Sequence, residues 1–133
     1  MHDVTELNTI LTNMAKKTLV IGASLKSNRY SNSAINRLKK YGHDVKAYGL
    51  RSGVVADVTI DTELIPYKNI DTVTLYLNPL RQKEYYNYII SLNPDRVIFN
   101  PGTENAEFYK LLDDAGISYE VACTLVLLAT NQY

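Results

Sequence analysis

Residues 22–33 collect small, hydroxyl-bearing and basic side chains in one loop between two apolar segments. Gly22 lets the backbone come close to a ligand, and Ala23 and Ser24 are too small to block that approach. A helix is expected to begin near Ser31, so its free N–H groups and positive dipole end would face the same space. The pattern predicts a phosphate or pyrophosphate site, although solvated strand-to-helix loops have a similar composition. The hydroxyls and positive charges come from Ser24, Lys26, Arg29, Ser31 and Ser33.

A basic residue, Arg51, follows the second expected strand, where NAD-binding proteins carry an acidic residue. The dinucleotide fingerprint has three glycines and, about 20 residues further on, a carboxylate for the ribose 2′-hydroxyl. Here the first loop has one glycine, and the second strand ends in Tyr48-Gly49-Leu50-Arg51 without a carboxylate. Arg51 suits an additional ribose phosphate. This disfavours NAD and leaves NADP or the 3′-phosphorylated ADP half of coenzyme A; the alternative is that Arg51 is a solvated loop charge.

The chain offers few groups for acid–base, nucleophilic or metal chemistry. Its histidines are His2 and His43, and His43 is expected at a helix end on the amino side of the sheet, away from a ligand. Cys123 is the candidate nucleophile, at a strand-to-helix junction that favours a thiolate; the alternative is a small buried hydrophobe. One cysteine and two scattered histidines do not make a metal-ligand set. We expect no catalytic residue and no metal.

Apolar segments along the chain alternate between strand and helix patterns. Compact apolar runs predict strands over residues 18–22, 44–48, 72–77, 96–99 and 118–122, with a short edge strand over 58–60. Stripes at helical spacing predict helices over 4–14, 34–41, 85–92, 108–115 and 124–130, and a single helical turn over 62–65. This alternation is typical of parallel strands joined by right-handed crossovers. We expect a doubly wound, mostly parallel α/β sheet of about five strands, with helices on both faces and ligands beyond the carboxyl ends of its strands.

Composition narrows the classes of partner. The chain has 133 residues, with 14 basic and 14 acidic side chains, so its net charge of zero disfavours nucleic acid. Its apolar runs are too short to cross a membrane, and its first six residues lack the basic lead and apolar block expected of a signal peptide. Its single cysteine fits a cytoplasmic protein. The apolar segment 125–128 is expected to be buried or to form a dimer contact. In the helix over 85–92, Tyr85 and Tyr88 are expected to face inward and Tyr86 outward.

Three segments resemble the small stand-alone CoA-binding proteins, which share their fold with the CoA-binding domain of succinyl-CoA ligase alpha subunits. They are the Gly-Ala-Ser turn in Val20–Ser24, the loop with Arg29-Tyr30-Ser31, and the apolar-glycine-x-x-valine rhythm of Tyr41–Val45. Asp71–Val73 and Ala115–Ile117 match later strand and helix-end signals. In that family the second strand commonly ends in Asn-Pro, whereas in this chain it ends in Tyr48-Gly49-Leu50. Near the C-terminus the family often carries the motif Asp-Arg-Cys-Pro, and of these four residues this chain has only the cysteine, Cys123.

The resemblance implies a Rossmann-like domain that holds CoA or an acyl-CoA, over residues 17–133 after an N-terminal amphipathic helix in residues 1–16. By position, the pyrophosphate would be held by Gly22, Ala23, Ser24, Arg29 and Tyr30. The adenine and ribose would be flanked by Tyr48, Leu50 and Arg51, and the other side of the crevice by Leu77, Asn78 and Pro79.

We therefore expect a non-catalytic binding or sensor module, as a homodimer or as a partner of a CoA enzyme. The alternative is a small NADP-dependent reductase, or the subunit that supplies its nucleotide-binding half. The shortness of the chain leaves little room for a separate substrate domain, which favours the binding module.

Overall fold

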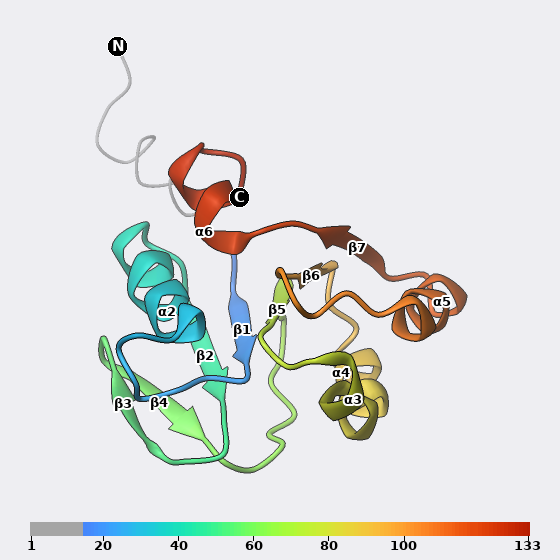
Figure 1. The fold of residues 1–133 in the computed structure, drawn as a ribbon, viewed down its shortest axis with the longest axis horizontal. Coiled ribbons are helices and arrows are strands. Elements are labelled where there is room, and N and C mark those ends of the chain that lie inside the picture. Colours follow the sequence, from blue (N-terminus) through green and yellow to red (C-terminus); the bar gives the residue numbers. More distant parts are fainter. Residues whose placement is uncertain (1–14) are drawn as a thin grey trace.

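The computed structural model describes residues 15–133, so the helix predicted over residues 4–14 lies outside the described part of the chain. The fold is α/β, with a seven-stranded sheet flanked by helices (Figure 1). The strands are β1 (Thr18–Ile21), β2 (Val45–Tyr48), β3 (Gly53–Val55), β4 (Val58–Asp61), β5 (Thr72–Leu75), β6 (Arg96–Phe99) and β7 (Ser118–Val121). The helices are α2 (Tyr30–Lys40), α3 (Pro79–Gln82), the 3-10 turn η1 (Lys83–Tyr85), α4 (Tyr86–Leu92), α5 (Ala106–Asp114) and α6 (Thr124–Ala129).

The sheet is doubly wound around β1. Its strand order is β3-β4-β2-β1-β5-β6-β7, and every neighbouring pair is parallel except β3 and β4. From β1 the chain builds one side of the sheet through β2 and β4, and then returns to build the other side from β5. The switch point therefore lies between β1 and β5, and the predicted fold class is confirmed.

The strand count is seven rather than about five. The strand that was not predicted, β3, forms an antiparallel hairpin with β4 across Ala56 and Asp57, whose φ angles are +49° and +65°. Two consecutive positive φ angles are the signature of a type I′ hairpin turn, which usually carries Asn-Gly or Asp-Gly. Because β3 covers it, β4 lies inside the sheet and is not the edge strand expected over 58–60.

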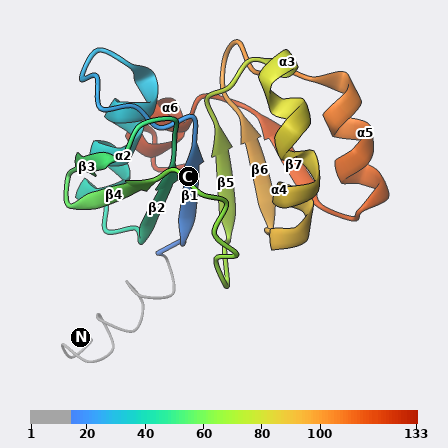
Figure 2. The same cartoon turned by 90° about the horizontal axis from the view of Figure 1, so that it is seen from below.

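Helices cover both faces of the sheet (Figure 2). Alternate residues of β1 belong to two different apolar clusters, one on each face. Leu19 and Ile21 belong to the apolar cluster that includes Ile89 of α4 and Phe108 of α5. Val20 belongs to the cluster on the other face, which includes residues of α2 and α6. Burial on both faces explains why the sequence of β1 contains a continuous apolar run.

Two local predictions are wrong. Residues 62–65 form no helical turn: Thr62 and Glu63 lie in a bend and the next two residues are irregular, because Ile65 precedes Pro66 and that position disfavours helical backbone angles. Tyr86 is buried rather than exposed; it stacks on Phe108 with ring centroids 4.4 Å apart. The 3-10 turn before α4 shifts the helical phase, so that Tyr85 and Tyr86 both face inward. Among the residues that the structure describes, no helix has the length and apolar character that crossing a membrane requires.

Candidate functional site

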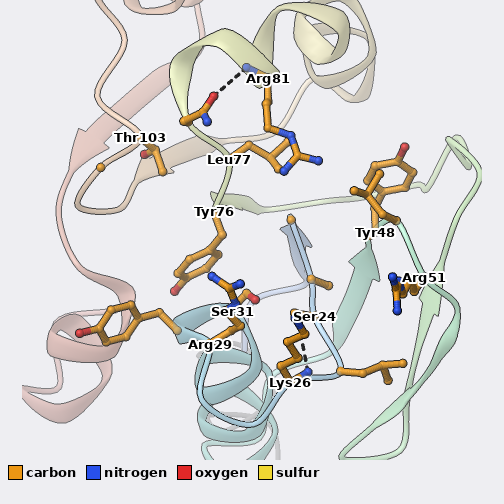
Figure 3. A pocket seen from close by; sticks show the side chains of 18 of the residues that line it. Ser24, Lys26, Arg29, Ser31, Tyr48, Arg51, Tyr76, Leu77, Arg81 and Thr103 are labelled. Carbon is orange, nitrogen blue, oxygen red and sulfur yellow. Dashed lines mark hydrogen bonds between the residues drawn. The ribbon is translucent and has the colours of Figure 1, made fainter.

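A cleft of about 540 Å³ lies at the carboxyl ends of β1, β2, β5 and β6, beside the switch in strand order. Doubly wound sheets bind their ligands at this position, and the volume is in the range of small-molecule sites. In the close view, the loop between β1 and α2 faces α3 across the cleft (Figure 3). The lining comes from four loops: Gly22–Lys26 and Arg29–Ser31; Tyr48–Arg51; Tyr76–Asn78 with Arg81 and Tyr85; and Pro101–Thr103.

Gly22 opens the β1–α2 loop and lies against the backbone that follows β5. Its φ is +91°, and a Cβ atom there would lie 2.9 Å from the carbonyl carbon and oxygen of Tyr76. It would also lie 3.1 Å from Cδ2 of Leu77. From the sequence, Gly22 was expected to let a ligand approach the backbone closely. In the structure, the group that approaches Gly22 closely is the backbone of Tyr76. Any side chain at Gly22 would therefore strain the fold as well as the cleft.

Contacts to α2 and to β3 hold the β1–α2 loop in place. The Asn32 amide, buried in the first turn of α2, donates to the carbonyl oxygen of Ser24 at 3.0 Å. The Ser24 hydroxyl in turn accepts from the Lys26 N–H at 3.1 Å. On the β3 side, the Leu25 side chain lies over Gly53, where a Cβ atom would come within 2.5 Å of it. The loop is thus anchored before any ligand arrives, which lowers the ordering cost of binding.

The cleft concentrates positive charge in a chain that is neutral overall. Its lining holds four cationic side chains and no carboxylate. Within residues 15–133 the ion pair formed is Arg96–Glu120, so none of the four cations is neutralised by a described carboxylate. The amino end of α2 also lies at the cleft without a side-chain cap. These features together make an anion site. The four cations are Lys26, Arg29, Arg51 and Arg81.

An aromatic pair from β2 and η1 lines one wall of the cleft. The hydroxyls of Tyr48 and Tyr85 are hydrogen-bonded at 3.1 Å, and their rings meet edge to face with centroids 5.3 Å apart. Burial and the Tyr48 hydroxyl raise the pKa of Tyr85 above its usual range. Tyr85 is therefore protonated at neutral pH, and this wall of the cleft carries no negative charge.

A buried amide ties two segments of the far wall together. Gln82, fully buried, donates through Nε2 to the carbonyl oxygens of Leu77 at 2.8 Å and Thr103 at 2.7 Å. Its Oε1 accepts from Nδ2 of Asn105 at 2.9 Å. Leu77 and Thr103 both line the cleft, so Gln82 fixes the loops after β5 and β6 relative to each other.

The structure brings together nearly all the predicted binding residues. The cleft is lined by Gly22, Ala23, Ser24, Lys26, Arg29, Tyr30, Ser31, Tyr48, Leu50, Arg51, Leu77 and Asn78. Pro79 does not line it; this residue starts α3, where its missing N–H costs no hydrogen bond. That these residues contact a ligand stays a prediction.

The described residues considered for chemistry, His43 and Cys123, lie outside the cleft, and His2 lies outside the described part of the chain. His43 lies in the connection between α2 and β2, where its Nδ1 accepts the backbone N–H of Lys16 at 2.9 Å. Cys123 is the half-buried residue before α6, and it is absent from the cleft lining. Of the apolar segment 125–128, Leu128 is buried and Val126 is exposed. Within residues 15–133, no three His, Cys, Asp or Glu side chains lie close enough to hold a metal.

The predicted site residues did not include several lining residues that follow β5 and β6, among them Tyr76, Arg81, Tyr85 and Thr103. A signal for Arg81 was present in Asn78-Pro79. Asn78 caps α3, its side chain accepts the Arg81 N–H at 2.9 Å, and Pro79 occupies the first helical position. An Asn-Pro pair directly after a strand predicts a helix that begins at the ligand edge, with Arg81 in its first turn.

Fold and cleft together define a doubly wound α/β domain with a positively charged cleft at its switch point. A family model described as "CoA binding domain" matches residues 16–129. The chain therefore belongs to the CoA binding domain family, as the resemblance of its motifs indicated.

Solved structures with this fold are similar over most of the chain. One, a crystal structure of an uncharacterized protein, shares 47% identity with a TM-score of 0.87, covering 90% of this chain and 98% of that chain. A hypothetical protein from Pyrococcus horikoshii OT3 shares 29% identity with a TM-score of 0.75, covering 94% of this chain and 89% of that chain. A Thermus thermophilus protein shares 21% identity with a TM-score of 0.79, covering 99% and 100%; this likeness shows the fold alone. The comparison with curated proteins gives no match.

Proposed function

We propose that this protein binds coenzyme A or an acyl-CoA through its phosphates in the cleft, as a binding or sensor module without chemistry of its own. The observation that carries the proposal is the lining of four cations and no carboxylate at the carboxyl edge of the sheet. CoA presents a pyrophosphate and a ribose 3′-phosphate, and arginine binds phosphate through paired, charge-assisted hydrogen bonds. Membership of the CoA binding domain family supports the same ligand.

The lining also supports an orientation for the ligand. The pyrophosphate is expected against Gly22–Ser24 and Arg29, where the loop meets the amino end of α2. The adenosine is expected over the end of β2, where Arg51 meets the 3′-phosphate and Tyr48 and Leu50 flank the base. This is the side on which a doubly wound fold holds the adenosine half of a dinucleotide.

The lining of the cleft favours a binding role, because its described residues lack the histidine and carboxylate side chains that most often act as general acids and bases. Among residues 15–133, those that line the cleft include no His, Cys, Asp or Glu. The serines there, Ser24 and Ser31, have no His, Asp or Glu beside them among the described lining residues. General acid–base or nucleophilic catalysis needs such a partner within hydrogen-bonding reach.

Calorimetric titration with CoA, dephospho-CoA, NADP and NAD tests the proposal. We expect CoA to bind most tightly and dephospho-CoA about 10- to 150-fold more weakly, which is the effect of one charge-assisted hydrogen bond of about 1.5–3 kcal/mol. Arg51→Gln is expected to abolish the difference between CoA and dephospho-CoA. Arg37→Gln, which removes an exposed charge from the last turn of α2, is the matched control and should leave it unchanged.

Two outcomes would contradict the proposal. Binding of NAD as tightly as CoA would remove the role of the additional phosphate. Tighter binding of NADP than of CoA would favour the alternative, a small NADP-dependent reductase or its nucleotide-binding subunit.

A further inference from the structure

One cation of the cleft stands apart from the other three. Lys26 and Arg29 come from the β1–α2 loop and Arg51 from the connection between β2 and β3, whereas Arg81 comes from α3 after β5. Figure 3 shows the Arg81 side chain extending into the cleft from the wall opposite Ser24 and Lys26. The positive charge of the cleft is therefore divided across the switch point.

The two sides of a switch point hold the two halves of a dinucleotide-like ligand. If the phosphates and the adenosine occupy the loops after β1 and β2, as proposed above, the other half lies along the loops after β5 and β6. In CoA that half is the pantetheine arm with its thiol, and it carries no charge. The wall on this side is well defined, because Gln82 fixes the carbonyl groups of Leu77 and Thr103.

Arg81 has no electrostatic complement among the residues that the structure describes. None of the residues 15–133 forms an ion pair with it, and its exposed side chain lines the cleft. A neutral pantetheine thiol would supply no complement either. A guanidinium in this place is suited to a carboxylate, which it can bind through two parallel hydrogen bonds.

We propose that the cleft is specific for an acyl-CoA whose acyl group ends in a carboxylate, that is, a thioester of a dicarboxylic acid, and that Arg81 binds this carboxylate. The inference rests on the proposed function, since it requires CoA to bind with its phosphates toward the β1–α2 loop. It goes further by naming the class of acyl group and the residue that selects it.

Titration with matched thioesters tests this inference. Malonyl-CoA and isovaleryl-CoA have acyl groups of similar shape, with a carboxylate in one and two methyl groups in the other; glutaryl-CoA extends the comparison to a longer acid. We expect the wild-type protein to bind malonyl-CoA or glutaryl-CoA about 10- to 100-fold more tightly than isovaleryl-CoA. Arg81→Gln should remove this preference, because it should weaken the dicarboxylic thioesters about 10- to 100-fold more than CoA itself, while Arg37→Gln should leave the preference unchanged.

The possible failures are distinguishable. If Arg81→Gln weakens CoA and all thioesters by the same factor, Arg81 binds a phosphate and the inference is overturned. If wild-type protein binds CoA but does not prefer either dicarboxylic thioester, the inference is overturned while the proposed function stands. If the wild-type protein binds no CoA at all, the proposed function itself fails.

Discussion

The carbonyl oxygen of Ala23 occupies the place that a side chain on Gly49 would need, since a Cβ atom there would overlap it. The N–H groups of Gly22 and Ala23 both donate to the Tyr48 carbonyl oxygen, at 3.0 and 2.9 Å. The segments that follow β1 and β2 are therefore in direct backbone contact. Because both segments line the cleft, this contact sets its shape on the side expected to hold the phosphates.

Gly49→Ala is expected to lower the free energy of unfolding by about 1–3 kcal/mol, because the added methyl group must push two backbone segments apart. It should also weaken CoA binding, since the loop that carries Ala23 and Ser24 moves. Urea unfolding and calorimetry measure the two effects. Ser52→Ala, at an exposed position in the same connection, is the control and should change stability by less than about 0.5 kcal/mol. A Gly49→Ala protein as stable as the control would show that the two segments separate without cost.

Gln82→Glu tests the buried amide that links the far walls of the cleft. The substitution preserves shape but replaces a group that donates to two carbonyl oxygens with an acceptor, and it places a charge where the side chain is fully buried. We expect a loss of about 2–5 kcal/mol at pH 7, which becomes smaller at pH 5 as the new carboxyl group is protonated. Asn87→Asp makes the same chemical change at an exposed site of α4 and should be nearly neutral. A loss equal to that of Asn87→Asp would rule out a structural role for the Gln82 hydrogen bonds.

The fold was predictable because strands that are buried on both faces leave a clear apolar pattern in the sequence. A sheet covered on both faces by helices favours strands that are apolar at consecutive positions, and residues 19–21 have this pattern directly before Gly22. The polar loops after each such strand must then gather at one edge, which is why residues predicted from three separate segments line one cleft.

The features that were not predicted from the sequence depend on the local conformation of the backbone. The hairpin of β3 and β4 turns at Ala56-Asp57, and alanine rarely adopts the positive φ that this turn requires, so composition gave no turn signal. Tyr86 was placed on the wrong side because a 3-10 turn shifts the helical phase before α4. Arg81 was missed because the helix was expected to begin at Tyr85, six residues after the start of α3 at Pro79.

Tyr76→Phe is expected to stabilise the protein by about 1 kcal/mol. The Tyr76 hydroxyl is buried without a hydrogen-bond partner among the described residues, and a buried unpaired hydroxyl costs free energy. The nearby hydroxyls of Thr74 and Thr124 are bonded to each other at 2.8 Å. Tyr48→Phe is the contrasting variant, because it removes the hydrogen bond to Tyr85 and should destabilise by about 1 kcal/mol. Equal losses from both substitutions, measured by urea unfolding, would mean that the Tyr76 hydroxyl has a partner such as a bound water.

The last prediction concerns the pH dependence of stability and rests on His43. Burial, with the positive charges of Lys16 and Arg96, lowers the pKa of His43 below its usual 6.5. The neutral ring is also needed because its Nδ1 accepts the Lys16 N–H, an acceptor that protonation removes. In the unfolded chain the pKa of His43 returns to about 6.5, so His43 binds a proton more readily there than in the folded chain.

As the pH falls from 7.5 through 6.5 to 5.5, the free energy of unfolding is expected to decrease, with the full contribution of neutral His43 present only above this window. Carboxylates titrate mainly near pH 4 and contribute little there. His43→Gln keeps a polar side chain without a proton to gain, so its stability should change less between pH 7.5 and 5.5. Urea unfolding of both proteins at the two pH values measures the difference. A wild-type protein that gains stability at pH 5.5, or one whose loss equals that of His43→Gln, would show that His43 is protonated as easily in the folded chain as in the unfolded one.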